Sequence, residues 1–251
     1  MHRLLTNGTL EWAPTPERLA AFIAAVFATL LCAPTASADL TVSGRAVYVD
    51  RVFEFGVGFT GEERELPIRL ADVWVRDANT GQLLVGSRTR SDGTFSMVLE
   101  GSGTVDLNVR VQARTSYFFA AQSVFASPGE PHVLDSPGLF DQPLDGSLDV
   151  GTLVAEEVTA GQFVGNPFNI LDQMVDGTLW LESVGALPLP SPMIAFWPGG
   201  NGSQTGISTF YIADDDGYDD VAQLHELGHC LGLRHSFGAS TDIPNYDPEY
   251  H

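Results

Sequence analysis

The chain has 251 residues, a length that suits one or two domains. Its formal net charge is −20, because it has 32 acidic residues and only 12 basic ones, all of them Arg. Such an acidic chain lacks the basic surface that binds phosphates, which argues against a nucleic acid or an anionic membrane surface as a partner. A hydrophobic content of 44% predicts a packed core and excludes a disordered chain.

The N-terminal 38 residues have the pattern of a secretory signal peptide. An apolar run over residues 19–31 is too short to span a membrane comfortably, and Ala36-Ser37-Ala38 follows it as a cleavage site. We therefore expect residues 1–38 to be removed and the mature protein to be secreted, extracellular or periplasmic, with no membrane partner afterwards. The mature chain then keeps a single cysteine, Cys230, which excludes an internal disulfide.

Residues 40–158 alternate between polar and apolar side chains in the way that is typical of β-strands. Asn79-Thr80-Gly81 predicts the turn of a hairpin between two of these strands. Short strands at this spacing favour a β-sandwich over residues 39–125. The clearest expected strands cover residues 41–49, 71–77, 82–85, 94–99 and 105–111.

The segments ADVWVRDANTGQLL and TRSDGTFSM resemble the carboxypeptidase-regulatory-like (transthyretin-like) β-sandwich. The resemblance covers about residues 40–125 and rests on turn chemistry. It implies an accessory module rather than an active site. We expect residues 39–158 to fold without the rest of the chain, since their strands would supply both faces of one sandwich.

Residues 126–158 are predicted to be a linker or an irregular edge of the sandwich, because residues 126–151 are rich in Pro, Gly and Asp. His132 lies in this segment beside Pro131. A lone histidine in such a place is interpreted as a surface residue rather than a metal ligand.

The second half, residues 159–251, mixes helices and strands. Asn166-Pro167 is typical of an N-cap followed by a first helical residue, and it leads into a helix over residues 168–182. Short apolar strands are predicted over residues 193–197 and 209–213. Together with the sandwich, this order predicts an α+β fold. The helix residues expected to face the core are Ile170, Leu171, Met174 and Val175.

A second helix is predicted over residues 219–231, with either Asp219 or Asp220 as its N-cap. Gly232 follows and permits a left-handed stop. One face of this helix is apolar and should anchor it to the core. The residues of that face are Leu224, Leu227 and Leu231.

The other face of this helix carries the residues that could bind a metal ion or take part in catalysis. At about 100° per residue, His225 and His229 lie about 40° apart, and Glu226 lies about 60° further round. Histidines at i and i+4 are what one helix can offer to one metal ion. After the turn, His235 could bring a third imidazole to the same point. Three imidazoles leave one ligand position open, which is typical of a catalytic zinc site.

The segment HELGHCLGLRH matches HExxHxxGxxH, the zinc signature of the metzincin metallopeptidases. The Ser-Phe-Gly that follows is similar to matrixins, which have Ser there, and to pappalysins, which have Thr-Phe. The resemblance implies that His225, His229 and His235 are zinc ligands. It also implies that Glu226 is the general base for a zinc-activated water that hydrolyses peptide bonds.

One feature of the metzincins has no counterpart here. Their Met-turn lies beneath the zinc, some distance after the third histidine. In this chain the last methionine is Met193, and only residues 236–251 follow His235. We therefore expect a metzincin-like domain over residues 159–251 that is incomplete, either because the chain is truncated at its C-terminus or because it is a degenerate relative. The abrupt ending at NYDPEYH favours truncation.

Two neighbours of the motif have competing interpretations. Carboxylates clustered over residues 214–220 could hold Ca²⁺, although a solvated turn with a helix cap is favoured. Cys230 is interpreted as a small buried hydrophobe rather than a metal ligand or a redox switch.

The sequence thus predicts a secreted zinc endopeptidase that has Zn²⁺ as its cofactor and a protein or peptide as its substrate. The main alternative is a non-catalytic secreted protein, in which the β-sandwich binds a partner and the zinc site is vestigial. A zinc-dependent hydrolase of a non-peptide substrate is a third candidate.

Overall fold

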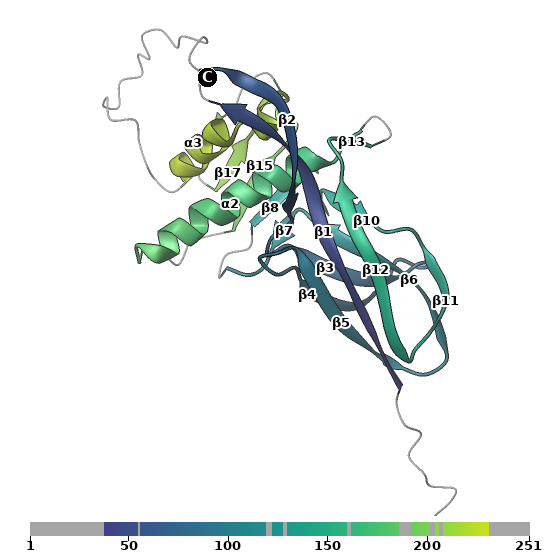
Figure 1. Ribbon diagram of the computed structural model, residues 1–251. Coiled ribbons are helices and arrows are strands. Elements are labelled where there is room, and N and C mark those ends of the chain that lie inside the picture. The colour runs from purple at the N-terminus through teal and green to yellow at the C-terminus, as the bar shows by residue number, and fades with distance from the viewer. Residues whose placement is uncertain are drawn as a thin grey trace, which may run out of the picture. The chain divides into compact units, whose positions relative to one another are not determined.

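The computed structural model describes residues 38–54, 56–118, 122–127, 130–159, 162–185, 192–200, 204–205 and 208–230. The expected signal peptide lies outside these residues, except for Ala38. Over the described part of the chain, no helix is long and apolar enough to cross a membrane. The fold is predominantly β with additional helices, which agrees with the expected α+β class (Figure 1).

The first sheet is built around β1, its longest strand. It contains β1 (Ala38–Glu54), β2 (Gly58–Pro67), β5 (Thr94–Gly101) and β12 (Gly146–Ala155). Along one edge, β1 pairs antiparallel first with β5 and then with β2, and along the other edge it pairs in parallel with β12. A strand of this length can therefore connect three others, and Figure 1 shows β1 and β12 side by side.

The second sheet has the order β10-β6-β3-β4, and β11 pairs with β6. Its strands are β3 (Asp72–Asp77), β4 (Leu83–Arg88), β6 (Thr104–Gln112), β10 (Val133–Asp135) and β11 (Leu139–Pro143). The predicted hairpin is confirmed as the antiparallel pair β3–β4. Alternate residues such as Val73 and Val75 of β3 and Phe95 of β5 are buried in one hydrophobic cluster, which joins the two sheets as predicted for a sandwich.

The prediction of a linker over residues 126–158 is wrong. This segment contains β9 (Glu130–Pro131), β10, β11 and β12, and each of these strands pairs with an earlier one. The alternative of an edge fits better, because β12 lies at the border of the first sheet. The turn-forming residues that suggested a linker lie between short strands that take their partners from distant parts of the sequence.

A third sheet combines strands from both halves of the chain. Its order is β16-β17-β15-β8-β7, with β9 paired to β8. Its remaining strands are β7 (Arg114–Thr115), β8 (Gln122–Ser127), β15 (Met193–Phe196), β16 (Gln204–Thr205) and β17 (Thr209–Tyr211). Because β15 pairs in parallel with β8, the expected border between a sandwich module and a second domain passes through a sheet.

Two α-helices accompany this sheet: α2 (Gly165–Ser183) comes before β15 in the chain, and α3 (Asp220–Cys230) comes after β17. The short strands β13 (Val158–Thr159) and β14 (Gln162–Phe163) pair and lead into α2, and the 3-10 helix η1 (Asp216–Tyr218) precedes α3. Helix α2 begins at Gly165, before the expected Asn166 cap, and its N-cap is Val164. The backbone N–H groups of Val164 and Gly165 donate to the backbone carbonyls of Glu157 and Glu156. The four core residues predicted for α2 are confirmed as buried. Helix α2 packs on β1, β8 and α3.

We expect a fragment of residues 38–158 to fail to fold independently, contrary to the modular expectation. The fragment would leave β8 without β15, and it would leave the buried hydroxyl of Tyr48 without Asn169 and Asp172 of α2. The whole chain should unfold in one cooperative thermal transition. The fragment should bind ANS and lack near-UV circular dichroism. A cooperative transition of the isolated fragment would show that the sandwich is a module after all.

Candidate metal site

Helix α3 begins at Asp220, and Asp219 caps its N-terminus. Asp219 Oδ1 accepts hydrogen bonds from the backbone nitrogens of Val221 at 2.9 Å and Ala222 at 3.0 Å. These N–H groups would otherwise lack partners in the first helical turn. Of the two aspartates that the sequence offers for this role, Asp219 is therefore the cap. Asp220 instead accepts a hydrogen bond from Asn169 of α2.

The buried face of α3 differs in part from the predicted one. Its buried side chains are those of Gln223, Glu226 and Leu227. Leu227 is confirmed as a core residue, and it lies so close to Gly177 of α2 that a Cβ there would be 2.5 Å from Leu227 Cδ2. Leu224 is 41% exposed, because Gln223 takes the inward position and donates from Nε2 to Asp216 O. Leu231 lies outside the described residues.

His225 and His229 bring their ring nitrogens together. Their Nε2 atoms are 3.1 Å apart, and the two rings are nearly perpendicular with centroids 4.6 Å apart. In a tetrahedral zinc site with Zn–N bonds of about 2.0–2.1 Å, two ligand nitrogens lie about 3.3 Å apart. The two imidazoles therefore fit one metal ion. Without a metal, one neutral imidazole can donate a hydrogen bond to the other at this distance.

Glu226 belongs to the buried face of α3, and it directly follows the first histidine of the pair. Its side chain is only 8% exposed, whereas His225 is exposed and His229 is half-buried. The Glu226 carboxylate also influences Cys230, four residues on. Burial raises the pKa of the Cys230 thiol to about 11, and the charge of Glu226 contributes to that increase. The thiol is therefore neutral near pH 7, as the hydrophobe interpretation requires.

The third expected ligand, His235, lies outside the described residues. Within the described ranges, no group of three His, Cys, Asp or Glu side chains is close enough to hold a metal ion. The structure thus brings together two of the three predicted ligands, with the predicted base on the same helix.

The carboxylates considered for calcium have separate roles in the turn before α3. Asp214 Oδ1 accepts a hydrogen bond from the backbone nitrogen of Gly200 at 2.8 Å. Asp219 caps α3, and Asp220 binds Asn169. Asp215 is exposed. These contacts match the favoured interpretation, a turn followed by a helix cap.

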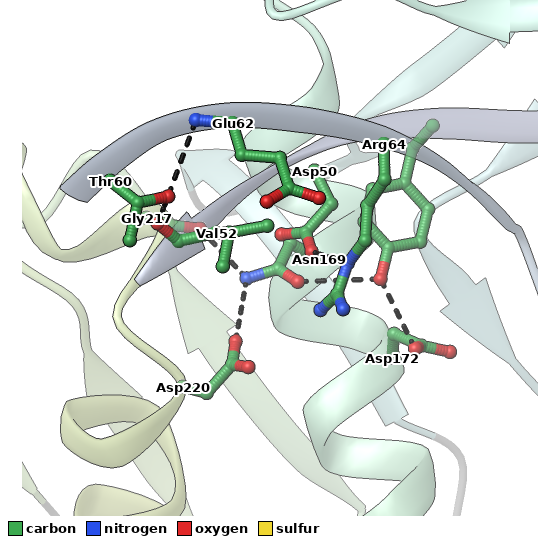
Figure 2. A network of polar contacts seen from close by, with 10 residues as sticks. Asp50, Val52, Thr60, Glu62, Arg64, Asn169, Asp172, Gly217 and Asp220 are labelled. Carbon is green, nitrogen blue, oxygen red and sulfur yellow. Dashed lines mark hydrogen bonds and ion pairs between the residues drawn. The ribbon is translucent and has the colours of Figure 1, made fainter. Parts of the chain in front are cut away.

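A buried polar network attaches α3 to the rest of the fold (Figure 2). Asn169 of α2 donates from Nδ2 to Asp220 Oδ1 at 3.2 Å and to Gly217 O at 3.3 Å. On its other side, Asn169 Oδ1 accepts from the hydroxyl of Tyr48, which lies on β1. Figure 2 shows Asn169 between Asp172 and Asp220, so one amide connects a strand and two helices.

The same network continues from Tyr48 to an ion pair. Tyr48 Oη is 3.1 Å from Asp172 Oδ2, and Arg69 donates to Asp172 Oδ1 at 2.6 Å and to Asp176 at 2.8 Å. Burial, reinforced by the charges of Asp172 and Asp50, raises the pKa of the Tyr48 hydroxyl, so it stays a donor. The sequence analysis missed these residues, although polar side chains within the apolar face of α2 were a signal that could have found them.

His132 is not the surface residue that the sequence predicts. It is half-buried, its Nε2 is 2.8 Å from the carbonyl oxygen of Trp197, and its ring centroid is 5.9 Å from the indole. Burial lowers the pKa of its imidazole. This contact gives His132 a packing role between β9 and the end of β15.

Comparisons with known proteins give no family. No family model matches the chain, and no curated protein matches it either. Among solved structures, the chain is similar to a 9R-lipoxygenase from Cyanothece PCC8801, with a TM-score of 0.28 and 14% identity. The similarity covers 68% of this chain and 29% of the lipoxygenase chain, so this chain spans less than a third of that protein. A TM-score this low carries no argument about fold or activity.

The Asp220 carboxyl makes stability depend on pH. Burial raises its pKa from 3.8 to about 6, while the hydrogen bond from Asn169 acts in the opposite direction. Asp50 adds to the increase, as does Asp219 to a smaller extent, and Arg64 opposes it. Because the folded state holds this proton more tightly than the unfolded state, the contribution of Asp220 to stability falls as the pH rises from about 4 to 6.

The Asp220→Asn variant should therefore gain stability over the wild type as the pH rises. Asparagine cannot ionise, and its Oδ1 still accepts from Asn169. From pH 4 to pH 7, the difference in the free energy of unfolding should grow by up to about 3 kcal/mol, measured by urea denaturation. Asp215→Asn, on the exposed turn, is the control and should show no such growth. A constant difference for Asp220→Asn would contradict the assignment.

Proposed function

We propose that this protein is a secreted zinc-dependent endopeptidase of the metzincin type. In this proposal His225, His229 and His235 hold the zinc, and Glu226 is the general base. The substrate is a protein or a peptide. The proposal rests on the HExxHxxGxxH spacing together with the placement of its first three functional residues on α3.

The observation that carries the proposal is the approach of two imidazoles. His225 Nε2 and His229 Nε2 are 3.1 Å apart, close to the separation of about 3.3 Å for two nitrogens on one tetrahedral zinc ion. Neutral imidazole is a preferred zinc ligand, and three of them with one open position are the donor set of a catalytic site. The residues present therefore fit a zinc ion.

The mechanism assigns separate tasks to the side chains of α3. Zinc, when bound by three imidazoles, lowers the pKa of water and polarises a carbonyl group. Glu226 directly follows the first ligand, and its carboxylate would accept the proton of the attacking water. The burial of Glu226 restricts its rotamers, so it can be held in place for this transfer.

The surroundings of α3 support this use of the helix. The Asp219 cap, the contact of Leu227 with Gly177 and the bond between Asn169 and Asp220 all restrain α3. Catalytic side chains need such restraint, because a displacement of about 1 Å can reduce the rate by about 10²-fold.

The test compares two substitutions in the full-length gene product. Glu226→Gln should keep the zinc, because the three ligands remain, but should reduce peptide hydrolysis by at least about 10²- to 10⁴-fold, because an amide cannot accept the proton. His229→Ala should lose both zinc and activity. Metal analysis of the purified protein and chelator-sensitive cleavage of casein measure the two effects separately.

Glu182→Gln is the matched control, since it makes the same chemical change at an exposed position of α2. It should leave the zinc content and the activity unchanged. Zinc-loaded Glu226→Gln with wild-type turnover would contradict the role of Glu226. A wild type that binds no zinc would favour the non-catalytic alternative. Zinc binding and hydrolysis of esters without hydrolysis of casein would favour a non-peptide substrate.

A further inference from the structure

A shallow, open polar depression, called the cavity below, lies on the second sheet, outside the helices that carry the candidate metal site. Its volume is about 370 Å³, within the usual range for small-molecule sites of about 300–1,000 Å³. Strands β3 and β4 and the residue after β7 form its walls. The residues that line it are Asp72, Trp74, Gly86, Ser87, Arg88 and Ser116.

One wall of the cavity is the indole of Trp74. Val73 and Val75 on either side are fully buried, so Trp74 points to the opposite, outer face of β3. Gly86 is its direct partner on β4. A Cβ at Gly86 would lie 3.3 Å from Trp74 Cδ1, which means that the indole lies across the glycine. The missing side chain therefore makes room for an aromatic surface at the cavity.

Another wall is fixed by Asp72, which is buried. Its Oδ1 accepts hydrogen bonds from Ser116 Oγ at 2.7 Å and from Ser116 N at 3.1 Å, and its Oδ2 is 3.4 Å from Arg114 Nε. The charge of Asp72 is thus already balanced by a guanidinium. Ser116 is exposed, and its hydroxyl oxygen, which donates to Asp72, can still accept a hydrogen bond from a ligand. Ser87 lines the cavity through its place in β4, but it is the partner of the inward-facing Val73, so its side chain belongs to the other face of the sheet.

Arg88 supplies positive charge that no acidic side chain in the described part of the chain balances. It is the direct partner of Asp72 in the β3–β4 ladder, yet it forms no ion pair with any described residue. Its guanidinium lies over the ring of Tyr117, 5.3 Å from the centroid. The aromatic ring therefore holds this cation at the cavity, and its N–H groups can still take a bidentate carboxylate.

We propose that this cavity binds an acidic saccharide, with a sugar ring against Trp74, a sugar hydroxyl on Ser116, and the sugar carboxylate on Arg88. A flat aromatic surface beside a hydroxyl acceptor suits a ring that is apolar on its faces and polar at its edge. The guanidinium of Arg88 favours a sugar that also carries a negative charge. The proposal is independent of the zinc chemistry on α3.

Because the protein as a whole is strongly acidic, binding of an anion at the cavity depends on Arg88. A chain with a net charge of −20 repels anions in general, so non-specific attraction does not hold an acidic sugar here. Retention of the anion must come from the local cation, and retention of the sugar from the indole. The two contributions can be removed one at a time.

The experiment measures binding of glucuronate, glucose and acetate to the whole chain by isothermal titration calorimetry. Glucuronate should bind, and glucose and acetate should each bind at least about tenfold more weakly, because each lacks one of the two main contacts. Arg88→Gln should weaken glucuronate binding to about the level of glucose. Trp74→Ala should abolish glucuronate binding, and Trp74→Phe should restore part of it. Circular dichroism checks that each variant is folded.

Arg90→Gln is the matched control, because Arg90 is also exposed and lies two residues beyond the cavity residue Arg88. It should leave glucuronate binding unchanged. The proposal is overturned if glucuronate does not bind at millimolar concentration. It is also overturned if acetate binds as tightly as glucuronate, or if folded Arg88→Gln and Arg90→Gln variants have the same affinity for glucuronate.

Discussion

The placement of α3 depends on the buried hydroxyl of Tyr48. This side chain is fully buried in β1, and its partners Asn169 and Asp172 lie 121 and 124 residues further along the chain. A buried hydroxyl without a partner costs about 1–3 kcal/mol, so β1 and α2 must come together to satisfy it. Asn169 then uses its other end to hold Asp220, the first residue of α3. The side-chain amide of Asn169 thus links the sheet to the helix that carries the histidines, and so fixes where that helix begins.

The contacts around Tyr48 bring several carboxylates close together, and arginines on β2 and just after it balance part of this negative charge. Arg69 bridges Asp172 and Asp176, and Arg64 donates to Asp50 at 2.8 Å. No arginine of the described residues pairs directly with Asp220, and burial raises its pKa to about 6. The carboxylates on α2 thus have an arginine partner, whereas the carboxylate at the start of α3, the helix of the candidate metal ligands, is buried and holds its proton more tightly.

Local patterns predicted the elements, but not their partners. Alternation identified β1, β3, β5 and β6, and helical periodicity identified the buried face of α2, because both signals are contained in a few consecutive residues. The parallel pairs β1–β12 and β8–β15 join distant segments whose register no local pattern encodes. For the same reason, Pro and Gly between short edge strands suggested a linker, and the partners of Tyr48 went unnoticed. The histidine spacing, by contrast, is local, and so the approach of the two imidazoles could be predicted.

The pairing across the expected domain border changes the role that can be assigned to the sandwich. An accessory module would have its own core and a flexible connection. Here β8 and β15 share a sheet, Gln122 of β8 donates to Thr178 of α2, and one hydrophobic cluster runs from Leu40 to Leu227. The strands therefore act as the support on which α2 rests and against which α3 is held. A substitution deep in the sandwich should then alter the geometry of the candidate metal site, because it changes the packing beneath α2 and α3. The cavity at Trp74 faces away from that core, so substitutions there can leave the core packing unchanged.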